Sequence, residues 1–348
     1  MLIKNSWYIA CRAHELKKAP LYRRIAEQSI VLFRDENDRA SALIDRCCHR
    51  GVPLSKGFVK NGCITCPYHG WQFNRTGQCV HIPELDTVGQ TIPKKAKVNF
   101  FPTVEKDGFI WIFTGANELA IDVEIPPFPF FHDPKGWGCS YNSVETACDW
   151  LHMAENILDG AHLPFIHEKS LDNGSRFSFQ WSRKFRREKK STGHPPKILE
   201  TEMTEKGFIA FAENQEEKLG FRFNVHLPST VLIELDFGPR KVRVWIHIVP
   251  TDKGACRIEH VFCRNFLTSR WLNPLFKKVG GKFLKEDIEI VSKQPFYRKE
   301  AGAWEVSTLR DKVPLLLRSA VYKLKAKEEE VILKQPEESV SQSTCVFS

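Results

Sequence analysis

The first third of the chain contains short apolar runs that predict β-strands. The runs cover residues 29–35, 40–46, 62–73 and 108–115, and they are rich in β-branched and aromatic side chains. Gly, Asn or Asp residues bound them, as is typical of strands joined by tight turns. A proline-rich passage at residues 125–138 then interrupts the pattern. We therefore predict a small all-β domain over residues 1–115.

A mixed pattern follows this domain. Residues 144–162 have the periodicity of a helix, and a longer helix is predicted near residues 271–293. Between them, the runs 207–213, 220–227, 229–237, 240–250 and 255–266 predict strands. Several of these runs alternate apolar and polar positions, which indicates an antiparallel sheet with one covered face. We predict an α+β domain over residues 116–324, and a polar, flexible tail over residues 325–348.

The composition is that of a globular protein. The chain has 348 residues, of which 42% are hydrophobic and 27% are charged. Its 25 Phe and 9 Trp residues favour large cores and an apolar cavity. The net charge of +9 suits an acidic protein partner or an anionic substrate. No pattern typical of a nucleic-acid-binding module is present, so we expect no nucleic-acid partner.

The cysteine content argues against a disulfide-bonded scaffold. Eleven cysteines are an odd number in a long chain, and the first residues lack the apolar core of a signal peptide. No apolar run approaches the roughly 18 residues that span a bilayer. We therefore expect a cytoplasmic protein without a transmembrane segment.

Two mixed pairs of Cys and His residues lie among glycines and prolines between residues 45 and 73. Cys47 and His49 form the first pair, and Cys66 and His69 form the second. Structural zinc sites usually draw on Cys–Cys and His–His pairs. A Rieske [2Fe–2S] cluster instead binds two cysteines on one iron and two histidines on the other. The mixed pairs favour this cluster over zinc, with one loop on each side of it.

A second group of candidate ligands lies in the predicted helix 144–162 and just after it. Asn156, Asp159 and His162 are spaced three apart and would share one helical face. On a continuous helix, His167 would point about 140° away from His162. Pro164 disfavours helix at the residue before it. We therefore expect the helix to end near His162, so that His167 can turn back toward the same metal ion.

A carboxylate ligand is predicted on the second long helix. On a helical wheel of residues 280–296, Asp287 falls inside the apolar stripe and Glu286 lies at its edge. A buried carboxylate is costly unless it binds a cation or accepts hydrogen bonds. Asp287 is thus a metal ligand, a helix cap or a member of a structural ion pair. With His162 and His167 it would form the 2-His-1-carboxylate triad of non-haem Fe(II) oxygenases.

Taken together, these motifs resemble those of the Rieske non-haem iron oxygenases, in particular the single-subunit-type monooxygenases. The resemblance covers about residues 1–310 and rests on the motifs Cys47-x-His49, Cys66-Pro-Tyr-His69-Gly-Trp, Asn156-x-x-Asp159-x-x-His162-x4-His167 and Glu286-Asp287 followed by Gln294. Cys48 is a departure, because many members carry proline there, but it leaves the ligand set untouched.

The resemblance implies a Rieske domain followed by a helix-grip (START-like) catalytic domain with an antiparallel sheet, assembled as a homotrimer. The Cys and His pairs would hold the cluster, and the triad would hold Fe(II). Asp159 would bridge His69 of one subunit and His162 of its neighbour. Asn156 would form a hydrogen bond near the iron.

The implied function is that of the terminal oxygenase of a multicomponent system. It would use O2 to hydroxylate or oxidatively demethylate an organic, ring-containing substrate. Electrons would come from NAD(P)H through a separate reductase, with or without a ferredoxin, because the chain has no dinucleotide-binding fingerprint. The basic segment 183–197 is either a solvated loop or a docking patch for an acidic reductase. The alternatives are a non-catalytic Rieske electron-transfer or ligand-binding protein, and a zinc-stabilised interaction protein.

Overall fold

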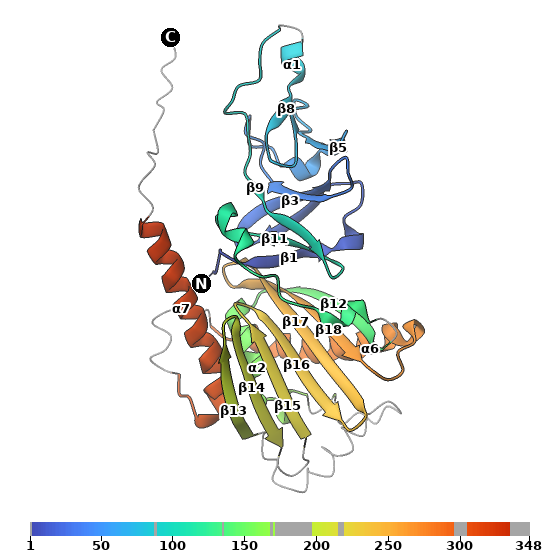
Figure 1. Cartoon of the computed structure of the whole chain (residues 1–348), viewed down its shortest axis with the longest axis vertical. Coiled ribbons are helices and arrows are strands. Elements are labelled where there is room, and N and C mark those ends of the chain that lie inside the picture. The colour runs from blue at the N-terminus through green and yellow to red at the C-terminus, as the bar shows by residue number, and fades with distance from the viewer. Residues whose placement is uncertain are drawn as a thin grey trace.

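The computed structural model describes residues 2–86, 89–133, 136–167, 170, 197–214, 219–295 and 305–334. The predicted α+β class is confirmed, because small antiparallel sheets come first and a large antiparallel sheet with helices follows (Figure 1). Of the basic segment 183–197, all but residue 197 lies outside the described residues.

Three small sheets form the N-terminal part. The first consists of β1 (Trp7–Arg12), β11 (Phe109–Phe113) and β10 (Thr103–Lys106). The second consists of β2 (Leu21–Ile25), β3 (Gln28–Arg34), β4 (Ala40–Ile44) and β9 (Phe100–Phe101). The third consists of β5 (Phe58–Lys60), β6 (Cys63–Thr65), β7 (Gln72–Phe73) and β8 (Cys79–His81). The predicted strands 29–35, 40–46 and 108–115 thus correspond to β3, β4 and β11.

The predicted single strand at 62–73 is wrong. The structure divides it into β6 and β7, and residues 66–71 form a tight loop between them. Gly70 adopts a φ of +73°, which favours glycine. Its N–H donates to the carbonyl of Cys66 at 3.1 Å, so the chain reverses where a continuous strand was expected.

Short helices connect these strands and lead into the C-terminal part. They are η1 (Ala13–Glu15), η2 (Leu54–Lys56), α1 (Pro83–Asp86), η3 (Asn117–Ile121) and η4 (Pro129–His132).

A seven-stranded antiparallel sheet forms the framework of the C-terminal part. Its strands, in spatial order, are β12 (Gly138–Thr146), β18 (Ala255–Arg264), β17 (Arg240–Asp252), β16 (Thr230–Phe237), β15 (Leu219–His226), β14 (Gly207–Asn214) and β13 (Lys197–Thr204). The five predicted strands are confirmed as β14 to β18. β12 and β13 were not predicted, and together they add one strand to each edge of the sheet.

The predicted helix at 144–162 is wrong at both ends. Residues up to Thr146 belong to β12, where Val144 pairs with Ile258 of β18. The helix itself, α2 (Trp150–Leu158), begins after Asp149, whose side chain accepts a hydrogen bond from the N–H of Leu151 at 2.9 Å. Strand pairing therefore overrides the helical periodicity of residues 144–146.

The C-terminal helices cover one face of the large sheet. α6 (Asn273–Val291) confirms the helix predicted near 271–293, and η5 (Arg270–Leu272) precedes it. After η7 (Leu309–Asp311), α7 (Lys312–Lys334) packs against α2. The prediction of a loose tail from residue 325 is wrong as far as residue 334, because Glu328 accepts hydrogen bonds from the N–H groups of Lys4 and Asn5. Residues 335–348 lie outside the described residues.

The large sheet is covered by helices on one face, and at β17 and β18 it is buried on both faces. On one face, residues such as Ile246 and Ile258 pack with α2, α6 and α7 in one hydrophobic core. On the other face, Trp245 and Val261 pack against the β1–β11–β10 sheet. The helix-covered face is the one that positions the candidate metal site.

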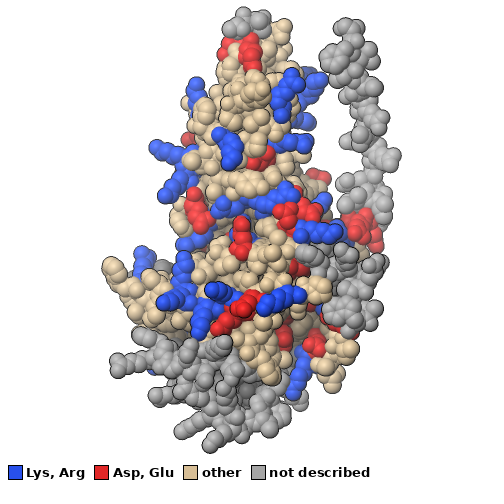
Figure 2. Space-filling view, turned by 180° about the vertical axis from the view of Figure 1, so that it is seen from behind, with Lys and Arg blue, Asp and Glu red and all other residues tan. Residues whose placement is uncertain are grey.

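Charged side chains of both signs are dispersed over the face of the molecule that Figure 2 shows. In Figure 2, lysine and arginine side chains on the described part of one face alternate with acidic ones. None of the described helices combines the length and the apolar character needed to cross a membrane.

Candidate cluster and metal sites

Two loops of matching backbone geometry carry the four predicted cluster ligands. Cys47 and His49 follow β4, and Cys66 and His69 lie between β6 and β7. In the first loop, the N–H of Gly51 donates to the carbonyl of Cys47 at 2.9 Å, and the N–H of Cys47 donates to Val52 at 2.9 Å.

The second loop repeats this pattern. The N–H of Gly70 donates to the carbonyl of Cys66, and the N–H of Cys66 donates to Trp71 at 2.8 Å. Gly51 and Gly70 both have positive φ, of 74° and 73°. Each loop therefore folds back on its own cysteine and presents one Cys and one His side chain.

The four side chains converge between the loops. Cys47 and Cys66 are buried, with 2% and 3% of their surfaces exposed, and their thiols lie side by side. The rings of His49 and His69 lie 4.7 Å apart, and His49 stacks on Trp71 at 4.6 Å. Nδ1 of His49 is buried and has no hydrogen-bond partner among the described residues, so it is available to bind a metal.

The geometry of this quartet disfavours a single zinc ion. A tetrahedral Zn²⁺ with bonds of about 2.0–2.3 Å holds its ligand atoms less than about 4 Å apart. Among the described residues, the three or more candidate ligands whose atoms all lie within 4.8 Å of one another are His162, His167 and Asp287. The four Cys and His residues of the two loops do not meet this criterion, so their ligand atoms are spread more widely. Two bridged irons would span the wider arrangement. Burial also raises the pKa of the Cys47 thiol to about 12, so a thiolate here requires a bound cation.

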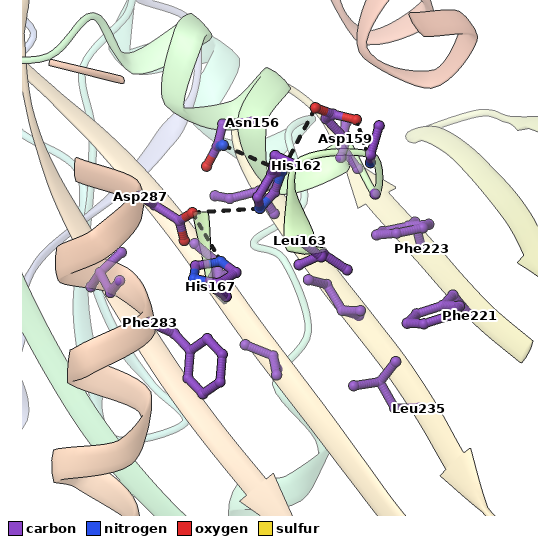
Figure 3. Close-up of a pocket in the computed structure, with 18 of the residues that line it drawn as sticks. Asn156, Asp159, His162, Leu163, His167, Phe221, Phe223, Leu235, Phe283 and Asp287 are labelled. Carbon is purple, nitrogen blue, oxygen red and sulfur yellow. Dashed lines mark hydrogen bonds and ion pairs between the residues drawn. The ribbon is translucent and has the colours of Figure 1, made fainter. Parts of the chain in front are cut away.

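The group of three ligands is His162, His167 and Asp287. The two histidines flank α3 (Leu163–Ile166), and Asp287 projects from α6 (Figure 3). Oδ1 of Asp287 lies 3.5 Å from Nε2 of His162 and 3.1 Å from Nε2 of His167. This oxygen is buried and accepts no hydrogen bond from the described residues. A cation between the three atoms would satisfy it.

The turn between the two histidines differs from the predicted one. α2 ends at Leu158, so Asp159 and His162 do not continue its face. The side chain of Asp159 accepts a hydrogen bond from the N–H of Ala161 at 2.7 Å and stabilises the turn there. Pro164 lies in the first turn of α3, where a proline is tolerated, rather than ending a helix.

Asn156 and Asp159 both lie beside His162. Nδ2 of Asn156 is 3.5 Å from Nδ1 of His162, and Oδ2 of Asp159 is 3.7 Å from the same nitrogen. Burial raises the pKa of Asp159, but hydrogen bonds from His162 and from the N–H of Ala161 outweigh it, so the pKa is lowered overall. Asp159 is thus ionised and can orient the imidazole of His162.

Glu286 is a site residue that the sequence pattern did not identify. Its Oε2 lies 3.0 Å from Nδ1 of His167, and its Oε1 accepts a hydrogen bond from the hydroxyl of Ser170. Burial lowers the pKa of His167, but the carboxylates of Asp287 and Glu286 more than compensate, and the pKa is raised. Glu286 therefore fixes the imidazole with Nε2 toward Asp287. In the sequence it stands at the edge of the apolar stripe and in the Glu286-Asp287 motif, and neither feature assigned it a role.

A cavity of about 200 Å³ opens from the three ligands into the space between the large sheet and α6. Its walls are mostly aliphatic and aromatic side chains, including Phe221, Phe223, Leu235 and Phe283 (Figure 3). The predicted apolar cavity is therefore present, and the candidate metal site lies at one corner of it.

Comparisons with known proteins identify the family of the chain. A family model of the Rieske [2Fe–2S] domain matches residues 6–100, and one of the vanillate O-demethylase oxygenase C-terminal domain matches residues 146–327, more than half of the chain. The chain belongs to the Rieske oxygenases. This confirms the predicted family, whereas the predicted domain boundaries at residues 115 and 324 remain predictions.

Curated relatives of this Rieske oxygenase match over part of their length. A putative toluene-4-sulfonate monooxygenase iron-sulfur subunit from Comamonas testosteroni is 36% identical over 180 residues, 52% of this chain and 51% of the relative. The oxygenase component of dicamba O-demethylase from Stenotrophomonas maltophilia is 36% identical over 169 residues, 47% of this chain and 48% of the relative. The chain thus spans about half the length of the curated relatives it matches.

Solved structures match the Rieske oxygenase over nearly its full length. Dicamba monooxygenase bound to dicamba superposes with a TM-score of 0.77 at 23% identity, covering 94% of this chain and 99% of that one. NdmA of Pseudomonas putida CBB5 superposes with a TM-score of 0.77 at 25% identity, covering 94% and 92%. The predicted fold class, a Rieske domain followed by a sheet-rich catalytic domain, is confirmed.

Proposed function

We propose that the protein is the terminal oxygenase of a multicomponent system. It monooxygenates an organic, ring-containing substrate with O2, by hydroxylation or oxidative demethylation. The observation that carries the proposal is the joint presence of a binuclear-cluster quartet, a 2-His-1-carboxylate group and an apolar cavity at that group. Relatives named as a dicamba O-demethylase and a vanillate O-demethylase support the reaction class.

Two separate groups of residues hold the two metal centres in this proposal. Cys47, His49, Cys66 and His69 hold the [2Fe–2S] cluster, and His162, His167 and Asp287 hold Fe(II). When bound, the cluster supplies single electrons, and the iron activates O2 for insertion into a C–H bond.

The protein itself orients the ligands and shapes the cavity. Glu286 holds Nδ1 of His167, so that Nε2 faces the metal. Asn156 and Asp159 keep His162 in place. The apolar walls hold the substrate beside the open positions of the triad and exclude water.

Electron supply requires partners in this proposal. NAD(P)H reduces a separate reductase, with or without a ferredoxin, which reduces the cluster. The protein forms a cytoplasmic homotrimer in which Asp159 bridges His162 of its own subunit to His69 of a neighbour. In support, the side chain of Asp159 already contacts His162, and it is 31% exposed, so it can also reach a neighbouring subunit.

The proposal is tested by metal analysis and turnover of an Asp287→Ala variant. The wild-type protein should contain about three irons and two inorganic sulfides per chain. With a ferredoxin-type reductase, NADH and O2, it should release formaldehyde or hydroxylated product from the probe 4-ethylanisole. The variant should lose about one iron and all turnover, yet keep the brown cluster.

A matched variant, Glu289→Ala, alters an exposed carboxylate of the same helix and should behave as wild type. Full iron content and turnover in Asp287→Ala would refute the ligand assignment. A wild-type protein that binds both centres but uses no O2 with any substrate would instead support the non-catalytic electron-transfer alternative.

A further inference from the structure

The loop that connects β18 to α6 exposes two large apolar side chains at a projecting corner of the molecule (Figure 1). Trp271 is 92% exposed and Leu267 is 53% exposed. Tryptophan is highly buried on average in folded proteins, and leaving both side chains in water forgoes the free energy of burying them. Their exposure on one short loop therefore indicates a surface that binds something.

Buried contacts hold this loop in a fixed shape. Arg264, at the end of β18, donates to the carbonyls of Gly138 and Leu267 at 2.8 and 2.9 Å. It also donates to Oδ1 of Asn273 at 3.0 Å and lies 3.8 Å from the ring centre of Phe276 on α6. Leu267 has a φ of +48°, which a leucine keeps only where its surroundings fix the backbone. The loop is therefore preorganised, and its ordering costs little when it binds.

The neighbouring turn between β16 and β17 brings two cations to the same corner. Asn265 of the loop donates to the carbonyl of Pro239 at 3.0 Å and accepts a hydrogen bond from the N–H of Lys241 at 2.6 Å. These contacts tie the turn to the loop. Arg240 lies 6.0 Å from the ring centre of Phe266. The side chains of Arg240 and Lys241 are both exposed beside the loop.

The loop and the outward side of α6 add further cations. Residues 265–285 contain five lysine or arginine residues and no Asp or Glu. All five are exposed, namely Arg270, Lys277, Lys278, Lys282 and Lys285. In Figure 2, which shows the molecule from behind, basic side chains border this projecting corner. The exposed Trp271 and Leu267 thus lie among cations that no acidic residue of the same segment offsets.

An anionic lipid surface fits this combination best. A cation near an anionic bilayer strengthens binding by about fivefold, and tryptophan is enriched at the boundary between lipid headgroups and acyl chains. A second copy of the chain is disfavoured as the occupant, because the net charge of +9 repels these cations. A nucleic acid would attract the cations but would gain nothing from Leu267.

We propose that the protein binds peripherally to an anionic lipid bilayer through this corner, with Trp271 and Leu267 among the headgroups and the surrounding cations against the lipid phosphates. The inference goes beyond the proposed function, since neither metal centre takes part in it. The contact is reversible and depends on salt, because it combines a small apolar area with exposed charges. α6 also lines the apolar cavity, so binding brings the cavity close to a phase in which apolar ring compounds concentrate.

Co-sedimentation of the protein, with both metal centres loaded, with lipid vesicles tests the proposal. The probes are vesicles of phosphatidylcholine alone and vesicles of phosphatidylcholine mixed with an equal amount of phosphatidylserine. At about 0.1 M salt we expect binding about tenfold tighter or more to the vesicles that contain phosphatidylserine. At about 1 M salt, where screening acts within about 3 Å, the difference should disappear.

Variants at the corner separate the apolar contribution from the charged one. Trp271→Ser should weaken binding to the phosphatidylserine vesicles by about tenfold, because its apolar surface is no longer buried in lipid. Its matched control is Ile121→Ser, because Ile121 of η3 is 90% exposed and lies outside the corner. This control should bind as the wild type does.

The charged contribution is tested with a pair of adjacent lysines. Lys277→Gln with Lys278→Gln should weaken binding by about 25-fold, about fivefold for each cation removed. The matched control is Lys94→Gln with Lys95→Gln, an exposed pair in the N-terminal part of the chain, and it should retain the wild-type affinity.

A fluorescence measurement shows whether Trp271 itself meets the lipid. Brominated phosphatidylcholine in the phosphatidylserine vesicles should quench part of the tryptophan fluorescence of the wild type. Trp271→Phe keeps an apolar ring and should still bind, but it should lose this quenching.

The inference is overturned if binding does not depend on phosphatidylserine, or if Trp271→Ser and the Lys277 and Lys278 variant bind vesicles as the wild type does. It is also overturned if these variants change the oligomeric state in sedimentation velocity, which would make the corner a subunit interface. Binding to a single-stranded oligonucleotide but not to vesicles would assign the surface to nucleic acid instead.

Discussion

At the scale of single residues, Glu286 decides how firmly His167 can hold a metal. Its carboxylate lies 3.0 Å from Nδ1, while Asp287 lies 3.1 Å from Nε2 of the same ring. A metal-binding histidine commonly donates its second N–H to a carboxylate, which fixes the tautomer and raises the basicity of the metal-binding nitrogen. Glu286 is therefore a positioning residue, and it acts through His167.

We predict that Glu286→Gln lowers the affinity of the mononuclear site for iron by about 10–100-fold, because the amide is a weaker and uncharged acceptor. The cluster should be unaffected. Iron retention against a chelator measures the affinity, and the visible spectrum reports the cluster. Glu289→Gln, on the exposed side of the same helix, is the control. Equal iron affinity in the two variants would show that Glu286 does not position His167.

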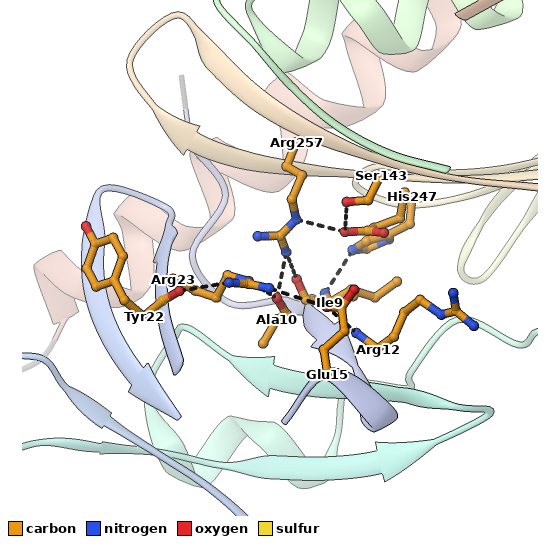
Figure 4. Close-up of polar contacts among 10 residues, drawn as sticks. Ile9, Ala10, Arg12, Glu15, Tyr22, Arg23, Ser143, His247 and Arg257 are labelled. Atoms are coloured by element: carbon orange, nitrogen blue, oxygen red, sulfur yellow. Dashed lines mark hydrogen bonds and ion pairs between the residues drawn. The ribbon is translucent and has the colours of Figure 1, made fainter. Parts of the chain in front are cut away.

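His247 illustrates a different effect of burial, on stability. It lies where the large sheet meets β1, near Arg257 (Figure 4). Its Nε2 accepts a hydrogen bond from the N–H of Ile9 at 3.3 Å, so Nδ1 carries the proton and faces Thr230 Oγ1 at 2.7 Å. Burial, together with the positive charge of Arg257, lowers the pKa of His247 to about 3.

The sign of the resulting pH dependence follows from this depressed pKa. Below about pH 6.5 the unfolded chain protonates His247, whereas the folded protein does not until about pH 3. The free energy of unfolding therefore falls as the pH falls through this window, by about 2 kcal/mol at pH 5 from this residue. In urea unfolding at pH 7.5 and pH 5, His247→Gln should lose about 2 kcal/mol less than the wild type. The exposed His14→Gln control should lose as much as the wild type.

Some of the site residues could be predicted from the sequence and others could not. Spacing and the helical wheel predicted the two Cys–His pairs as cluster ligands, and His162, His167 and Asp287 as metal ligands, since each pattern is local. The positioning role of Glu286 was missed. It depends on contacts with His167 and Ser170, more than a hundred residues away in the sequence, and local periodicity does not encode such contacts.

At the scale of elements, an ion pair fixes α7 to α2, the helix that precedes His162 in the chain. Arg318 of α7 donates to both carboxylate oxygens of Glu155, at 2.6 and 2.8 Å, and to Glu305 at 2.8 Å. Burial raises the pKa of Glu155, and the Arg318 guanidinium opposes that rise. Since the Glu155 side chain is only 11% exposed, its charge depends on this partner.

We predict that Arg318→Met lowers the free energy of unfolding by about 3 kcal/mol, because it leaves Glu155 buried without its cation. Adding Glu155→Gln should recover part of the loss. Lys327→Met, at an exposed position of α7, should change stability by less than about 0.5 kcal/mol. Urea unfolding measures these values, and hydrogen exchange of α2 shows where the protein loosens. An unchanged exchange rate in α2 would argue against this role of the ion pair.

The elements were predicted unevenly for related reasons. β14 to β18 alternate clearly, because one face meets the helices and the other is less apolar over much of their length. The last three residues of β12 were taken for helix, since its partner β18 lies more than a hundred residues away in the sequence. α7 was missed because its outer face is charged. Its buried side consists of Val313, Leu317 and Val321, with Leu316 and Leu324 partly buried beside them.

At the scale of the whole molecule, the two candidate sites lie far from each other along the chain's long axis. Figure 1 shows β5 and β8, beside the cluster loops, at one end, with α2 and α6 beyond the β1–β11–β10 sheet. The junction between them is fixed by buried contacts: Arg257 pairs with Glu259 at 2.8 Å and donates to the carbonyl of Ala10 at 3.0 Å (Figure 4). A fixed junction does not bring the centres together, so in the homotrimer that we propose the electrons would cross between subunits.

Mixed oligomers test this crossing directly. Cys47→Ser removes the cluster and keeps the iron, and Asp287→Ala does the reverse, so each variant alone should be inactive. When both are co-produced in equal amounts, a quarter of the interfaces in a ring carry an intact cluster facing an intact iron site. We therefore predict roughly a quarter of the wild-type turnover of 4-ethylanisole for the unseparated mixture. Separate affinity tags then isolate the mixed trimers, in which one interface of the three is productive, and these should show roughly a third of the wild-type turnover. Co-production of Asp287→Ala with His162→Ala, which lacks an iron site in every subunit, should remain inactive. Mixed oligomers of the first pair that form but show no activity would mean that each cluster serves only the iron of its own chain.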